Sequence, residues 1–201
     1  MASPSEPVSA SRDPASAVLS LVEARPPTLG DGRLLCVDGP AGSGKTTLAG
    51  AVAARRPEAR VIHMDDLYDG WDGLPRLGAP LAGLLRPLAR GEAGSYRRYD
   101  WHAGRFAETV TVPPGSLLVL EGVGSGSRAH ADLITVLAWV EVAPGLRLRR
   151  GLERDGIALA DRWRQWTLDE DLLFRREGTA ERADLLVDGT GVTPPTLRTA
   201  P

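Results

Sequence analysis

The sequence predicts an α/β fold in which a parallel β-sheet carries helices on both faces. Short apolar runs alternate along the chain with segments of helical spacing, and no tight-turn signal joins consecutive runs. That alternation is typical of parallel strands connected by crossover helices. The chain has 201 residues, which is room for one domain with a packed core. Its 42% hydrophobic and 25% charged residues are the proportions of an ordinary globular protein.

The first third of the chain predicts a flexible start, a short helix and two strands. Residues 1–16 are rich in Ser, Pro and Ala and are expected to be flexible. A helix over about 17–24 ends before a pair of prolines. The apolar run 33–38 enters a glycine-rich loop and predicts a buried strand, which a helix over 45–55 follows. A second strand, 60–64, ends at two aspartates.

The remaining elements follow from the same patterns. Three Gly and two Pro make 67–80 a loop, and leucines at helical spacing predict a helix over 81–89 that Pro87 kinks or shortens. Segments 96–101 and 108–112 form a small hairpin. Further buried strands are expected at 116–120, 133–142 and 183–187. Helices are expected from 144 onward and over about 160–176, and 190–201 is expected to be a flexible tail.

A phosphate-binding motif lies between the first strand and its helix. Residues 39–46 read Gly-Pro-Ala-Gly-Ser-Gly-Lys-Thr, which matches G-x-x-x-x-G-K-[ST]. Lys45 is the only lysine among 24 lysines and arginines. A slim ammonium can enter a tight phosphate cradle, whereas a planar guanidinium does not fit. The sequence therefore predicts that this loop binds a nucleoside triphosphate.

Each residue of the motif has an expected part in that site. Backbone N–H groups and the positive end of the following helix attract the phosphates. Lys45 is expected to bridge the β- and γ-phosphates, and the Thr46 hydroxyl to ligate Mg²⁺. The expected nucleotide-binding residues are Gly39, Ala41, Gly42, Ser43, Gly44, Lys45, Thr46 and Thr47.

Other sequence features exclude several classes of nucleotide-binding protein. A GTPase would need an Asn-Lys-x-Asp motif to bind guanine, which a chain with a single lysine at position 45 cannot provide. An ABC-type ATPase would need a Leu-Ser-Gly-Gly-Gln signature, which is missing. A net charge of −2 lacks the excess of basic residues that is typical of nucleic-acid-binding proteins. No apolar run is long enough to cross a membrane. Small-molecule kinases remain as the main class.

Carboxylates at the strand ends supply the expected acceptor chemistry. Ligands of an open parallel sheet collect at the carboxyl ends of its strands, where Asp65, Asp66 and Glu121 are expected. We assign Asp65 as the catalytic base that orients the acceptor hydroxyl, with solvated strand-end aspartates as the alternative. Glu121 is expected to hold Mg²⁺ through water, with a surface glutamate as the alternative. A metal cluster of His63 with the two aspartates is not expected, because adjacent strand residues alternate faces.

Arginines dominate the helix that begins near residue 144. Arg150 and Arg154 lie four residues apart and therefore on one face of that helix. Phosphoryl transfer requires cations over the transferred group, which a lid can supply. We therefore expect catalytic roles for Arg154 and Arg150. Cys36 lies in an apolar run and is expected to be a buried thiol in a reducing compartment.

Together these residues resemble the uridine kinase-like branch of the P-loop kinases, which is related to phosphoribulokinase and bacterial pantothenate kinase. The resemblance rests on segments spread over 33–189. These are Val37–Thr47, His63-Met64-Asp65-Asp66-Leu67-Tyr68, Tyr99-Asp100-Trp101 through Arg105, Leu120-Glu121-Gly122, Arg149-Arg150, Arg154-Asp155 and Ala183–Val187.

The resemblance implies a three-layer fold with a five-stranded parallel sheet in the order 2-3-1-4-5, and one kinase domain over 17–189. Its acceptor region would cover about 65–112 and a small lid about 147–166. Asp65, Tyr68, Tyr99, Trp101 and Arg105 would bind the acceptor. For Trp101, ordinary packing under the hairpin is the alternative to stacking on an acceptor ring.

The sequence thus predicts a cytoplasmic enzyme that transfers the γ-phosphoryl group of ATP, with Mg²⁺, to a hydroxyl of a small metabolite. A nucleoside such as uridine or cytidine is the favoured acceptor. A nucleoside monophosphate, a ribosyl vitamin, a sugar or an antibiotic remains an alternative, because position 104 is glycine where uridine kinases carry a histidine. GTP in place of ATP, the oligomeric state and a non-catalytic ATP-binding regulatory module also stay open.

Overall fold

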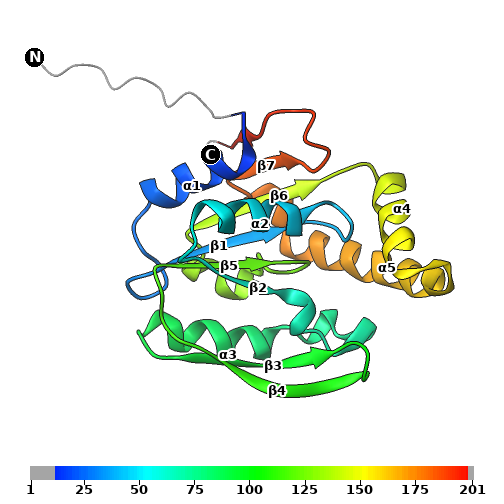
Figure 1. The fold of residues 1–201 in the computed structure, drawn as a ribbon, viewed down its shortest axis with the longest axis horizontal. Helices are drawn as coiled ribbons and strands as arrows, with labels where there is room; N and C mark the ends of the chain where they lie inside the picture. The colour runs from blue at the N-terminus through cyan, green and yellow to red at the C-terminus, as the bar shows by residue number, and fades with distance from the viewer. Residues whose placement is uncertain (1–11, 199–201) are drawn as a thin grey trace, which may run out of the picture.

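The computed structural model describes residues 12–198 and has three layers, with helices on both faces of a central sheet (Figure 1). Within these residues the sheet has six strands in the order β2-β5-β1-β6-β7-β8. The strands are β1 (Arg33–Asp38), β2 (Arg60–His63), β5 (Leu117–Glu121), β6 (Val136–Glu141), β7 (Leu185–Asp188) and β8 (Thr196–Leu197). The first five are parallel, and β8 pairs antiparallel with β7.

The five parallel strands lie in the expected order, 2-3-1-4-5 when they alone are counted. The expected count of five strands is wrong by one, since β8 adds an edge strand within the segment that we expected to be a tail. A two-residue strand has no periodicity to read, so only its partner β7 defines it. The helix α1 begins at Pro14, inside the segment expected to be flexible. Residues 1–11 of that segment lie outside the described residues.

The helices are α1 (Pro14–Ala24), α2 (Lys45–Arg55), α3 (Gly78–Ala89), α4 (Pro144–Asp155), α5 (Ala160–Glu177) and α6 (Thr179–Arg182). Asp13 caps α1, because its side chain accepts a hydrogen bond from the Ser16 N–H at 2.8 Å. Pro87 lies in the last turn of α3, which continues to Ala89. Short 3-10 helices connect these elements: η1 (Met64–Asp66), η2 (Gly70–Asp72), η3 (Leu74–Arg76), η4 (Arg128–Leu133) and η5 (Ile157–Leu159). They replace much of the loop expected over 67–80 and the start of the expected fourth strand.

Two hydrophobic clusters hold the layers together. Alternate residues of the central strands point to opposite faces of the sheet. On one face, Leu35 and Val37 pack with α1 and α2. On the other, Leu34 and Cys36 pack with α3 and α5. Cys36 is fully buried, as expected.

A separate two-stranded ribbon lies along α3 (Figure 1). It consists of β3 (Gly94–Asp100) and β4 (Arg105–Val112), which pair antiparallel. The expected hairpin is therefore confirmed. Between residues 12 and 198, no helix combines the length and apolarity needed to span a bilayer.

Helix α4 packs closely on α5 because Gly151 has no side chain. A Cβ at Gly151 would lie 2.3 Å from the ring of Trp163, which is 3% exposed. Gly151→Ala is therefore expected to lower the free energy of unfolding by about 1–2 kcal/mol, since overpacking outweighs the helix propensity that alanine gains. Urea unfolding measures this. The control is Gly145→Ala in the same helix, where a Cβ meets nothing within 4 Å. Equal stability of the two variants would contradict this packing.

Candidate active site

The phosphate-binding motif forms the turn between β1 and α2, and α2 begins at Lys45. Gly39 and Gly42 have φ angles of 138° and 77°, in the region that favours glycine. A Cβ at Gly39 would lie 2.1 Å from the Val140 carbonyl oxygen, and one at Gly42 would lie 2.6 Å from that of Arg147. The tight fold of this loop, which we call the P-loop (39–46), thus requires its glycines.

Lys45 lies within the P-loop and is only 8% exposed. Its Nζ donates a hydrogen bond to the carbonyl oxygen of Pro40 at 2.8 Å. Burial lowers the pKa of Lys45, while the nearby carboxylates oppose that change. Those carboxylates belong to Asp38, Glu121, Glu170 and Asp65. The fold therefore holds one ammonium at the centre of an acidic site.

The other P-loop residues have distinct positions. Ser43 is fully buried, and its Oγ has no hydrogen-bond partner in the protein. Thr46 and Thr47 are exposed in the first turn of α2. The Thr46 hydroxyl donates to Glu121 Oε1 at 3.1 Å. This places a hydroxyl beside a carboxylate at the end of β5.

His63 contacts the same carboxylate oxygen, a contact that sequence analysis missed. His63 ends β2 and pairs in register with Glu121, the last residue of β5. Its Nδ1 hydrogen-bonds to Glu121 Oε1, and that hydrogen bond raises the pKa of His63. The expected strand order already placed the two strands side by side, but their register cannot be read from local sequence.

Asp65 and Asp66 follow β2 in η1, and the structure separates them. Burial and the charge of Glu121 raise the pKa of Asp65, whereas Lys45 and Arg154 oppose that change. The Asp65 carboxylate therefore lies within electrostatic reach of Lys45 in the P-loop and of Arg154. Asp66 turns toward the ribbon, where the Tyr96 hydroxyl lies 3.5 Å from its Oδ2.

Trp101 lies beside Asp65 at the end of the ribbon. Its Nε1 donates to the Asp65 carbonyl oxygen at 3.0 Å, and its ring is 40% exposed. Tyr99 packs edge-to-face on it, with ring centroids 5.2 Å apart. Arg105 pairs with Asp100 across the ribbon and is exposed. The structure thus brings Trp101 and Tyr99 together next to the expected base.

The assignment of Tyr68 to acceptor binding needs correction. Tyr68 is 1% exposed, and its hydroxyl donates to the Val123 carbonyl oxygen at 2.8 Å. Its ring packs against Trp166 with centroids 5.0 Å apart. Because the side chain is enclosed and its donor is used, Tyr68 supports the site from the core. Trp163 and Trp166 are both buried, as expected.

Arg150 and Arg154 of α4 make different contacts. Arg150 donates to the carbonyl oxygens of Gly42 and Gly189, both at 3.3 Å, and so holds two loops together. Arg154 pairs with Asp155 at 2.7 Å, and its guanidinium lies over the Trp163 ring. The positive charge of Arg154 also opposes the rise in the pKa of Asp65, so the two side chains lie within electrostatic reach of each other. The first turns of α4, where the expected lid begins, contact the P-loop.

Two buried carboxylates around the P-loop were also missed. Asp38 accepts hydrogen bonds from the N–H groups of Gly39, Gly124 and Gly126 at 2.7–2.9 Å. Burial raises the pKa of Asp38 to about 6. Glu170, on α5, is 1% exposed and accepts from the Ala41 N–H at 2.9 Å. Its spacing from the two buried tryptophans at 163 and 166 was a signal that it shares their buried face.

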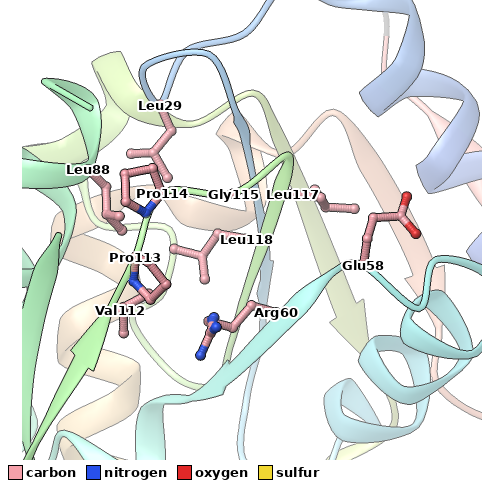
Figure 2. Close-up of a pocket in the computed structure, with 10 residues that line it drawn as sticks. All are labelled: Leu29, Glu58, Arg60, Leu88, Val112, Pro113, Pro114, Gly115, Leu117 and Leu118. Atoms are coloured by element: carbon pink, nitrogen blue, oxygen red, sulfur yellow. The ribbon is translucent and has the colours of Figure 1, made fainter. Parts of the chain in front are cut away.

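A separate hollow of about 180 Å³ lies at the amino ends of β2 and β5, the opposite end of these strands from Glu121. Figure 2 shows Arg60 and Glu58 at its rim and Pro113 and Pro114 in its wall. None of the predicted site residues lines it. Among residues 12–198, no group of three or more His, Cys, Asp or Glu side chains is arranged to hold a metal ion.

Comparison with known proteins gives structural relatives only. No protein-family model matches the chain, and no curated protein matches it significantly in sequence. A solved structure of a possible uridine kinase from Bacillus stearothermophilus superposes with a TM-score of 0.62 and 20% identity, covering 88% of this chain and 98% of that one.

Two further solved structures agree. D-glycerate 3-kinase from Cryptococcus neoformans has a TM-score of 0.53 and 14% identity, covering 92% of this chain and 97% of that one. A provisionally assigned fructose transport system kinase from Silicibacter has a TM-score of 0.56 and 21% identity, covering 82% and 95%. All three are P-loop kinase-fold proteins. The chain therefore has the three-layer α/β fold of the P-loop kinases.

Proposed function

We propose that the chain is a kinase that transfers the γ-phosphoryl group of Mg·ATP to a hydroxyl of a small metabolite. The observation that carries this proposal is the position of Asp65, which follows β2 in η1 and lies near enough to Lys45 of the P-loop and to Arg154 for their charges to act on its carboxylate. A protein that only binds nucleotide needs no carboxylate at that point. Phosphoryl transfer does, because the acceptor hydroxyl must be oriented and lose its proton.

The P-loop is suited to the triphosphate. Its N–H groups and the start of α2 attract anions, and Lys45 adds the one ammonium. Thr46 and Glu121 would hold Mg²⁺, since a hydroxyl beside a carboxylate is the partial oxygen set that Mg²⁺ shares with substrate phosphates. When bound, Mg²⁺ neutralises phosphate charge and helps align the transferred group.

The reaction follows from these positions. Asp65 orients the acceptor hydroxyl and receives its proton as the acceptor oxygen bonds to the γ-phosphorus. The bond from that phosphorus to the oxygen bridging it to the β-phosphate breaks, and ADP leaves with that oxygen. Lys45 and Arg154 stabilise the charge on the transferred and leaving groups.

Trp101 and Tyr99 support an acceptor that carries a ring. The exposed face of Trp101, fixed beside Asp65, offers a surface on which a planar base could stack. A nucleoside such as uridine or cytidine is therefore the acceptor class we favour, with Arg105 as a further contact. Nucleoside monophosphates, ribosyl vitamins, sugars and antibiotics are the other candidates. The test is ADP release from Mg·ATP against a panel of these compounds, in which one class should stimulate turnover well above the ATPase background.

The magnesium requirement provides a separate prediction. Glu121→Gln is expected to raise the Mg²⁺ concentration that gives half-maximal turnover by about 10-fold, because the charge that would hold the hydrated ion is lost. A magnesium titration at saturating ATP measures this. Glu92→Gln, an exposed glutamate paired with Arg90, is the control. The same magnesium dependence in both variants would remove Glu121 from the proposed site.

A further inference from the structure

Glu170 of α5 contacts both the P-loop and α4. The helices α4 and α5 lie beside the carboxyl ends of the parallel strands (Figure 1). One of its carboxylate oxygens accepts from the Ala41 N–H of the P-loop at 2.9 Å. The other accepts from Arg147 Nη1 of α4 at 2.8 Å. Glu170 is 1% exposed, and the Arg147 side chain is 13% exposed. A carboxylate buried this deeply is retained only where its partners satisfy it, so both contacts are built into the fold.

Helix α4 touches the P-loop at the same place. The Arg147 carbonyl oxygen lies 2.6 Å from where a Cβ of Gly42 would be, so the helix and the loop meet backbone to backbone. Arg150, one turn later, donates to the Gly42 carbonyl oxygen. Ala41 and Gly42 are therefore held both by α4 and by Glu170.

The same face of α5 also reaches the acceptor side of the site. Trp166 lies four residues before Glu170 and packs on Tyr68, which follows Asp65 by three residues. Trp166 further packs on Trp71, with ring centroids 5.9 Å apart. One helix thus contacts both the P-loop and the segment that carries the expected base.

We infer that Glu170 is a positioning residue that sets the P-loop in its phosphate-binding arrangement and joins it to α4. The inference rests on the proposed function, since it assigns a role in binding Mg·ATP. The negative charge of Glu170 near the phosphates would by itself weaken binding. Arg147 neutralises that charge at 2.8 Å, so loss of the hydrogen bond to Ala41 dominates when Glu170 is replaced.

Two variants that remove different parts of these contacts test this role. Glu170→Met keeps the volume and removes the acceptor. Glu170→Gln keeps an oxygen for the Ala41 N–H but turns an N–H₂ group toward Arg147. The dissociation constant of Mg·ADP, measured by calorimetry, is expected to rise about tenfold in Glu170→Met and about threefold in Glu170→Gln. In nucleotide-free protein, amide exchange of the peptide covering 39–44 is expected to accelerate in the same order.

The control is Asp171→Asn, which removes the neighbouring carboxylate of α5 and should bind Mg·ADP as the wild type does. Thermal unfolding of every variant shows which are folded, and Glu170→Gln alone decides the matter if the methionine variant is not. A merely structural role would lower the unfolding temperature and leave the affinity and the P-loop exchange of the folded protein unchanged. That result, or a gain in affinity, would overturn the inference. Wild-type protein that binds no Mg·ADP would instead overturn the proposed function, and the inference with it.

Discussion

Replacing Lys45 with methionine is expected to lower kcat/KM for Mg·ATP by on the order of 10³-fold, the largest effect we predict for a single residue. Lys45 is the only ammonium side chain in the protein, and it lies among the carboxylates of Asp38, Glu121, Glu170 and Asp65. Methionine has a similar length and no charge, so the triphosphate would meet these carboxylates without the opposing cation. Steady-state ADP release and direct Mg·ATP binding measure the loss.

Lys45→Arg separates charge from shape. Lys45 is only 8% exposed, and its Nζ donates a hydrogen bond to the Pro40 carbonyl oxygen. A guanidinium is wider, so the arginine variant is expected to lose most of the activity even though it keeps the charge. Arg55→Met, at the far end of the same helix, removes a cation outside the site and should leave turnover unchanged. An active arginine variant would contradict the requirement for a slim cation.

Asp65→Asn is expected to lower kcat by about 10²- to 10⁴-fold while the affinity for Mg·ATP stays within about twofold. Asparagine keeps the shape and one oxygen but cannot accept the acceptor proton. The proposed nucleotide contacts belong to the P-loop, which this change leaves intact. Single-turnover kinetics with the best acceptor and binding of Mg·ATP separate these two effects.

Asp66→Asn is a close control, because it removes a carboxylate one residue away. Asp66 faces Tyr96 on the ribbon, and its variant should retain most of the turnover. Equal losses in the two variants would mean that the site does not distinguish the two carboxylates. Full activity of Asp65→Asn would mean that another group takes the proton.

Much of the fold could be predicted because its strands are short apolar runs that end in polar residues. The run 33–38 matches β1 at both ends, and the helix over 45–55 matches α2. In these segments burial, periodicity and the glycine loop all favour the same structure. The spacing of Trp163 and Trp166 likewise predicted one buried helix face.

The contacts of the site were less predictable, because they depend on how distant segments meet. The contact between His63 and Glu121 requires the register of β2 on β5. The fixed position of Arg150 requires the close packing of α4 on Gly42. An arginine on a helix has the same local pattern whether it covers a substrate or holds a loop. Tyr68 is a further example. Its position in the sequence near Asp65 and Asp66 predicted a site residue, but the packing of α5 encloses its side chain.

The most direct test of the proposed phosphoryl transfer is mass spectrometry of the acceptor itself after incubation with Mg·ATP and the wild-type protein or Asp65→Asn. We expect one acceptor of the panel to gain a phosphoryl group on a hydroxyl with wild-type protein, and the variant to form far less of this product at equal ATP occupancy. Saturable binding of Mg·ATP without a phosphorylated product from any of these acceptor classes would contradict it.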